Sequence, residues 1–152
     1  MIEINNLTAD LIDEEFFKGV AKIVLKGENK KDALLSIALV GQKKIRELNK
    51  KYRGKNSPTD VLSFGDNMAG GIENITERGE LNLGEILICP QEVKKNAKKY
   101  GLTFKKELAR VLIHGILHLF RYEHEENKRS AEKMRKKEEI YFSKIKKLNF
   151  KI

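Results

Sequence analysis

Hydrophobic positions along the chain recur with two periods, and these divide it into strands and helices. Residues 2–5 alternate between apolar and polar side chains, the pattern of a short half-buried strand. Between residues 11 and 25 the apolar side chains recur every three or four positions, which predicts an amphipathic helix. We expect Gly27 to end this helix. Its apolar positions are Leu11, Phe16, Val20, Ile23 and Val24.

The rest of the chain mixes further strands and helices. Strands are expected at residues 34–40, 59–64 and 83–89. Helices are expected at residues 42–51, 90–100 and 131–148. The last of these helices is very basic, and Glu138 interrupts its apolar stripe. Residues 65–82 show little periodicity and are expected to form a loop, of a length that is usually functional or disordered.

One more helix is expected after Thr103, whose side chain is suited to an N-cap. Its buried face comprises Phe104, Leu108, Val111 and Leu112. Strands and helices follow one another without strict alternation, which favours an α+β fold. We expect residues 1–152 to form a single domain with a small, mostly four-stranded mixed sheet and about five helices.

Composition indicates a globular protein of the cytoplasm. The chain has 152 residues, 40% of them hydrophobic, which is enough for one core. The single cysteine, Cys89, excludes an internal disulfide and fits a reducing compartment. The N-terminus lacks the basic and apolar segments of a secretory signal, and no apolar run is long enough to span a bilayer. We therefore expect a cytoplasmic protein without a membrane partner.

The charge balance points toward polyanions without deciding the matter. A formal net charge of +9 favours nucleic acid first and an anionic membrane surface second. Lysine and glutamate are both abundant, however, as in many heat-adapted proteins, and such lysines can simply form a solvated surface. Charge alone leaves both interpretations open.

The candidate chemistry lies in one short segment, because all three histidines of the chain fall within eleven residues, at His114, His118 and His124. The first two are four residues apart, so a helix would bring them onto one face. His124 can join them only if the chain turns, and we expect the helix to end near Leu119 or Phe120. Three imidazoles suit one zinc-like divalent ion whose fourth position stays open for water, which is typical of a catalytic site.

Two alternatives follow from the same segment. Zinc peptidases with two histidines at this spacing carry a glutamate as general base directly after the first histidine, where this chain has Gly115. The spacing to the third histidine nevertheless resembles that of the longer metzincin motif. A four-ligand structural site would need a further cysteine or histidine. Cys89 lies far off in the sequence and is better interpreted as a buried apolar residue.

The histidine segment resembles the H-G-x-L-H-L-x-G-Y-D-H signature of the YbeY family. A second match runs from Leu48 to Arg53 and from Pro58 to Phe64, similar to the family's L-N-x-x-Y-R and T-D-V-L-S-F block. Residues 83–86 look like its G-D-I strand, and Glu107 agrees as well. The resemblance covers nearly the whole chain. It implies a bacterial metal-dependent endoribonuclease that acts in ribosomal RNA maturation.

The resemblance also implies roles for individual residues. Arg53 would act in the active site, where a guanidinium can grip a phosphate and neutralise charge in the transition state. His114 would belong to the catalytic group as well as to the metal ligands. Lys51 and Lys55 flank Arg53 and are candidates for binding RNA phosphates. Thr59 and Asp60, in contrast, are expected to start the next strand through side-chain to backbone hydrogen bonds.

Three positions depart from the family pattern. Arg121 replaces a glycine between the second and third histidines, so we expect a sparsely populated backbone conformation there. Glu123 and Glu85 replace aspartates and keep the carboxylate with a longer side chain. Each could orient a histidine ring or simply be an exposed acid.

Taken together, the sequence predicts a metal-dependent endoribonuclease for single-stranded ribosomal RNA, with the ribosome or ribosomal proteins as further partners. One divalent ion, zinc by preference, would be held by His114, His118 and His124. The alternatives are a zinc-dependent peptidase or amidase and a non-enzymatic ribosome-assembly factor with a structural metal.

Overall fold

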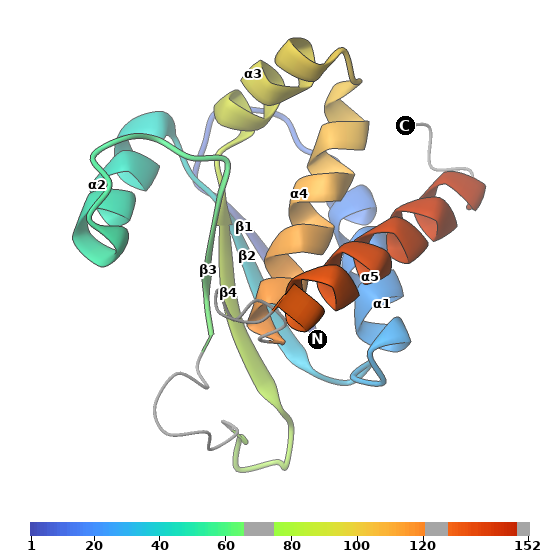
Figure 1. Ribbon diagram of the computed structural model, residues 1–152. Helices are drawn as coiled ribbons and strands as arrows, with labels where there is room; N and C mark the ends of the chain where they lie inside the picture. The colour runs from blue at the N-terminus through green and yellow to red at the C-terminus, as the bar shows by residue number, and fades with distance from the viewer. Residues whose placement is uncertain (66–74, 121–127, 149–152) are drawn as a thin grey trace.

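The computed structural model describes residues 1–65, 75–120 and 128–148, and within them one mixed sheet forms the centre of the molecule (Figure 1). Its strands lie in the order β1-β2-β4-β3, and β3 is the antiparallel edge strand while the other pairings are parallel. The strands are β1 (Ile2–Asn6), β2 (Leu34–Leu39), β3 (Val61–Phe64) and β4 (Asn82–Ile88).

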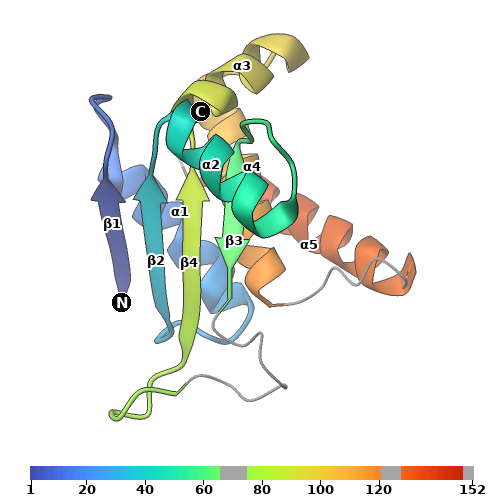
Figure 2. The same cartoon turned by 90° about the vertical axis from the view of Figure 1, so that its left-hand side faces the viewer.

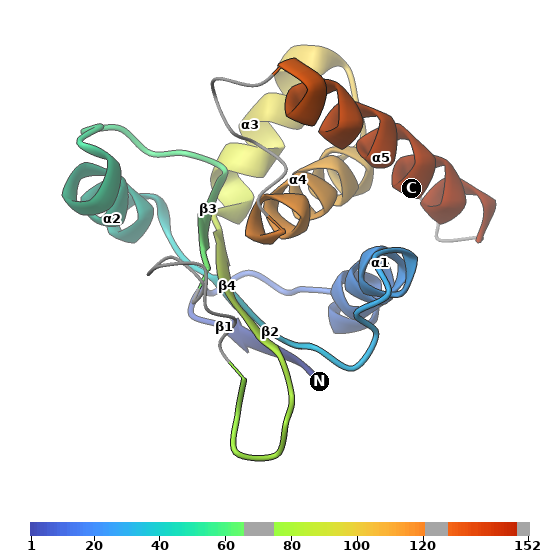
Figure 3. The ribbon, with the colours of Figure 1, turned by 60° about the horizontal axis from the view of Figure 1, so that its bottom comes forward.

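Helices cover both faces of this sheet unequally. The helices α1 and α4 lie on one face, with α5 packed on the outside of both, whereas α2 lies alone on the other face, as Figures 1 and 2 show. The third view shows α1, α4 and α5 gathered on the same side, with α3 near the beginning of α4 (Figure 3). The helices are α1 (Glu14–Gly27), α2 (Gln42–Arg53), α3 (Pro90–Tyr100), α4 (Phe104–Leu119) and α5 (Lys128–Lys147).

The alternation of side chains along the central strands explains the two layers. In β4, Ile86 and Ile88 are fully buried in the larger core against α1, α4 and α5. Leu87 points to the other face, where it joins Ile45 of α2 in a smaller cluster. Both β2 and β4 are buried on both faces, as expected for strands inside a mostly parallel sheet. The antiparallel β3 is placed at the edge, beside α4.

The expected α+β architecture is confirmed, with the helix α4 ending at Leu119 and Phe120 as its C-cap. Thr103 is its N-cap, as expected, and accepts a hydrogen bond from the backbone N–H of Lys106 at 3.1 Å. Several boundaries move by one to three residues. The expected loop at residues 65–82 is shorter, since Asn82 already belongs to β4 and Ile75 bridges to Leu81.

The start of α1 was predicted wrongly, whereas its end at Gly27 is as expected. Leu11 is fully exposed and lies before the helix, which begins at Glu14 because the side chain of Asp13 accepts the N–H of Phe16. Gly27 is the last residue of the helix and does not cap it. A Cβ at this position would collide with the ring of Tyr141 from α5, so the glycine permits a close helix contact.

Among the helices of the described residues, none combines the length and the apolar character that crossing a membrane requires.

Candidate active site

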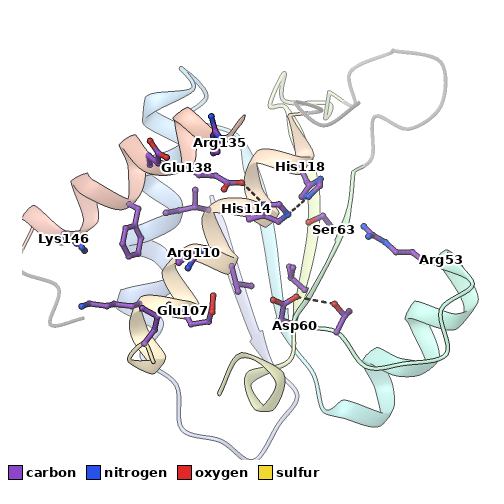
Figure 4. A pocket seen from close by; sticks show the side chains of 18 residues that line it. Arg53, Asp60, Ser63, Glu107, Arg110, His114, His118, Arg135, Glu138 and Lys146 are labelled. Atoms are coloured by element: carbon purple, nitrogen blue, oxygen red, sulfur yellow. Dashed lines mark hydrogen bonds and ion pairs between the residues drawn. The ribbon is translucent and has the colours of Figure 1, made fainter. Parts of the chain in front are cut away.

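The helix α4 presents one side to a cleft of about 730 Å³, which is also lined by residues of α2, β3 and α5. Glu107, Val111, His114 and His118 follow one another at intervals of three or four residues, so the helix aligns them along this side. Figure 4 shows the charged side chains that face the cleft from opposite walls. A positively charged residue on each wall, Arg53 from α2 and Arg110 from α4, lines it.

His114 and His118 lie as the sequence predicts, and their Nε2 atoms are 2.7 Å apart. The other nitrogen of His114, Nδ1, is 2.7 Å from Oε1 of Glu138 on α5. This contact places the proton of His114 on Nδ1, so its Nε2 presents a lone pair to the cleft. A ring held in this way is typical of a metal-binding histidine.

The two rings suit a shared ion. Two imidazole nitrogens bound to one tetrahedral zinc ion at about 2.0 Å lie about 3.3 Å apart. The Nε2 atoms of His114 and His118 are slightly closer, and a small rotation of either ring would open that separation. Within the described ranges, no set of three His, Cys, Asp or Glu side chains forms a candidate metal centre. The third expected ligand, His124, lies outside the described residues, as do Arg121 and Glu123.

Gly115 explains how α4 comes close enough to β3 to form this wall. It is buried, and an added Cβ would lie 3.1 Å from Val61 and 3.4 Å from the hydroxyl oxygen of Ser63. The Ser63 hydroxyl donates a 2.9 Å hydrogen bond to the carbonyl oxygen of Gly115. Position 115 therefore faces the sheet and not the cleft. Because position 115 is a glycine, the general base of the zinc peptidases is absent from this chain, which argues against the peptidase alternative.

The end of α2 carries Arg53 to the opposite wall. Asn49 is buried, and its amide donates a 2.8 Å hydrogen bond to the carbonyl of Ser57, which fixes the loop after the helix. The ring of Tyr52 packs edge-on against Phe64 of β3, with the ring centres 5.2 Å apart. Held by these contacts, Arg53 extends toward Ser63 and the histidines (Figure 4). Asn49 and Tyr52 of the matched motif therefore help to position the side chain of Arg53 at the cleft.

Glu107 and Asp60 lie at the end of the cleft away from His118 (Figure 4). Burial raises the pKa of the Glu107 carboxyl, while the nearby Arg110 guanidinium partly opposes this effect. Asp60 accepts hydrogen bonds at 3.3 Å from Thr59 and from Asn96 of α3. The expectation that Thr59 and Asp60 use side-chain to backbone bonds was therefore wrong, because their side chains bond to each other and to α3.

Some expected residues lie away from the cleft. Lys51 and Lys55 are exposed and are not among its lining residues. Glu85 is exposed and alternates with Ile86, so it faces the side of the sheet that α2 covers and cannot orient a histidine. Cys89 is fully buried on that same side, as expected for an apolar residue, and burial raises the pKa of its thiol.

Sequence reasoning missed Glu138 as the partner of His114. The available signal was its position inside the apolar stripe of α5, where a carboxylate needs a specific partner. That partner, 24 residues earlier, could not be named before α4 and α5 were seen side by side.

Comparison with known proteins identifies the family. The family model described as Endoribonuclease YbeY matches residues 3–146. This chain belongs to the endoribonuclease YbeY family. An endoribonuclease YbeY of Thermodesulfovibrio yellowstonii is 48% identical over 129 residues, which are 85% of this chain and 76% of that protein. Another, of a Sulfurihydrogenibium species, is 38% identical over 88% of this chain and 84% of its own length.

The fold is shared with a solved structure. The solution structure of a protein from Thermotoga maritima matches 95% of this chain and 89% of its own, at 31% identity and a TM-score of 0.63. Within the residues that the structure describes, the four-stranded mixed sheet with its five helices is therefore similar to the fold of that protein.

Proposed function

We propose that this chain is a metal-dependent endoribonuclease that cleaves single-stranded RNA in the maturation of ribosomal RNA. Membership of the endoribonuclease YbeY family supports the reaction class. One divalent ion, for which zinc fits the ligands best, would be held by His114, His118 and His124. The observation that carries this proposal is the Nε2 pair of His114 and His118 at 2.7 Å, with Glu138 holding Nδ1 of His114.

Each residue of the site then has a definite task. When bound, the ion supplies a Lewis acid and lowers the pKa of water, so that a nucleophile forms near neutral pH. Glu138 keeps the proton on Nδ1 of His114 and fixes the orientation of that ring. Arg53 binds the scissile phosphate from the opposite wall through its planar guanidinium. Lys51 and Lys55, outside the cleft, would contact phosphates of the flanking RNA.

The net charge of +9 supports an RNA partner. Contacts between cationic side chains and phosphates give affinity but carry little information about the RNA sequence. We place the protein in the cytoplasm and include the ribosome or ribosomal proteins among its partners, because an enzyme with little sequence readout needs another source of site selection. These partners follow from the proposed reaction and stand or fall with it.

The first test combines metal analysis with an RNA-cleavage assay on the purified chain. We expect one divalent ion per chain, and His114→Ala and His118→Ala should lose both the ion and cleavage while they keep the fold. If these variants keep the metal and full cleavage, the proposal is wrong. If they lose the metal and unfold, the site is structural, as in the assembly-factor alternative.

The second test concerns Arg53. Arg53→Ala should lower cleavage about a hundredfold or more, because it removes a charge that stabilises the transition state. The matched control is Arg46→Ala on the same helix, since Arg46 is exposed, is bonded to Asn56 and does not line the cleft. Equal activity of the two variants would remove Arg53 from the mechanism.

A further inference from the structure

The cleft continues beyond the histidines along α4. Glu107 precedes His114 by seven residues, which is two helical turns on the same side and roughly 10 Å along the axis. Both residues line the cleft. A group at Glu107 is therefore too far from His114 to touch the same phosphate. It is placed to contact a neighbouring nucleotide of an RNA strand that runs along the helix.

Glu107 is the unusual residue of this part of the cleft. Only 5% of it is exposed, and its Oε2 atom has no hydrogen-bond partner anywhere in the described residues. The neighbouring Asp60 differs, because Thr59 and Asn96 bond to its two oxygens. A buried carboxylate oxygen without a protein partner is unfavourable, so Glu107 calls for a partner from outside the described chain, such as a ligand in the cleft.

The surroundings of Glu107 fit a nucleotide. Lys106 and Arg110 line the same region and form no ion pair with any residue that the structure describes. Leu102 adds an apolar wall. Cations for a phosphate, an apolar surface for a base and an acceptor for its edge are thus combined. We name this region the Glu107 subsite, and it comprises Thr59, Asp60, Leu102, Lys106, Glu107 and Arg110.

We propose that Glu107 determines base specificity by accepting a hydrogen bond from the exocyclic amino group of a cytosine next to the cleavage site. This inference rests on the proposed RNA cleavage. Arg110 binds the phosphate of the same nucleotide. Phosphate itself does not suit Glu107, because two carboxylates, Glu107 and Asp60, repel an anion at that end. A carboxylate instead accepts readily from the N4 amino group of cytosine, and uracil has a carbonyl oxygen at that position.

The pair cytosine and uracil gives a sharp test, since the two bases have nearly the same size and differ at the edge that Glu107 would read. Short phosphorothioate oligocytidylate and oligouridylate of equal length, which resist cleavage, would be bound at pH 8 to the purified chain. We expect the wild type to bind the cytidine strand about tenfold more tightly, the effect of one base-edge contact. Glu107→Leu, which keeps the volume and removes the acceptor, should reduce the preference to about twofold or less.

Two control variants separate base reading from charge. Glu139→Gln removes an exposed carboxylate that lines the same cleft, and it should keep the cytosine preference. Arg110→Met should weaken both strands equally and flatten the salt dependence of binding. Thermal unfolding of each variant checks that the fold is retained, and Glu107→Met provides a second substitution of similar length without an oxygen acceptor if the leucine variant does not fold.

The outcomes distinguish this inference from the proposed function. Equal binding of the two strands by wild type, or an unchanged preference in the Glu107 variants, overturns the role of Glu107 even if RNA is cleaved. If neither strand binds and no RNA is cleaved, the proposed function fails, and this inference falls with it. A cytosine preference that disappears only in the Glu107 variants supports both.

Discussion

Two buried glutamates of this protein have opposite surroundings. The side chain of Glu28, at the end of α1, is 2% exposed and accepts hydrogen bonds at 2.8 and 2.9 Å from the Lys137 ammonium of α5. The hydroxyl of Tyr141 donates to it as well. Glu107, on α4, is similarly buried, yet its Oε2 has no partner among the described residues.

These surroundings indicate that Glu28 stabilises the fold, whereas Glu107 lowers its stability. Glu28 joins α1 to α5, and α5 in turn presents Glu138 to His114, so the contact indirectly positions the site. Glu107 joins no elements by a hydrogen bond that the structure describes, and it faces the cleft. Proteins tolerate such an unsatisfied group where function requires it.

The strongest test of this contrast is to break the Glu28 contact. Lys137→Met keeps the aliphatic length and removes the ammonium, so the buried carboxylate of Glu28 loses both of its hydrogen bonds to that group. We expect the free energy of unfolding to fall by about 3 kcal/mol, the lower end for a broken buried ion pair, because Lys137 is 26% exposed. Urea unfolding would measure it. A loss below about 1 kcal/mol would show that Glu28 is as poorly supported as Glu107.

At Glu107 we expect a substitution to raise the free energy of unfolding, the opposite of the effect at Lys137. Its pKa is raised by burial, so the folded state disfavours the ionised form. The cost is present above the pKa of the folded state and disappears as the pH falls below the ordinary value of 4.5. Glu107→Leu should therefore stabilise the protein by about 1 kcal/mol at pH 7.5, and this gain should shrink toward pH 4. A destabilised variant at pH 7.5 would mean that Glu107 has a structural role.

Local patterns in the sequence predicted much of this molecule. The spacing of His114 and His118 placed both on one side of α4, and the position of the helix end followed from the need for a turn. Thr103 was predicted as a cap because capping depends on the residues within one turn. The contact of Gly27 with Tyr141 was missed, since it depends on two helices that are more than a hundred residues apart in the chain.

The same limit applies to the site. Arg53 could be singled out by its motif, but the packing of Tyr52 on Phe64 that directs it across the cleft is a tertiary contact. Likewise, Gly115 was interpreted only as the absence of a catalytic base. Its actual reason is steric, because α4 approaches β3 at that point. The chemistry of a site could be predicted where it depends on residue type. Contacts between residues that are distant in the sequence could be identified only once the fold was known.

The smallest expected effect concerns a third carboxylate, Asp13, which is exposed and caps α1. The backbone N–H of Phe16 first, and then the side chain of Lys105, lowers the pKa of Asp13 below its ordinary value of 3.8. A lowered pKa stabilises the fold above the ordinary value, and this contribution is lost as the pH falls through the pKa of the folded state.

Asp13→Asn keeps an oxygen acceptor for Phe16 and removes only the charge. At pH 7 we expect a loss of about 0.5 kcal/mol or less, because the Lys105 ion pair is exposed and screened by salt. In urea unfolding, the difference between wild type and variant should shrink as the pH falls below 3.8, and it should also shrink in high salt. A larger, salt-independent loss would show that an exposed capping carboxylate contributes as much as the buried Glu28, and exposure would then no longer explain the contrast between the carboxylates of this protein.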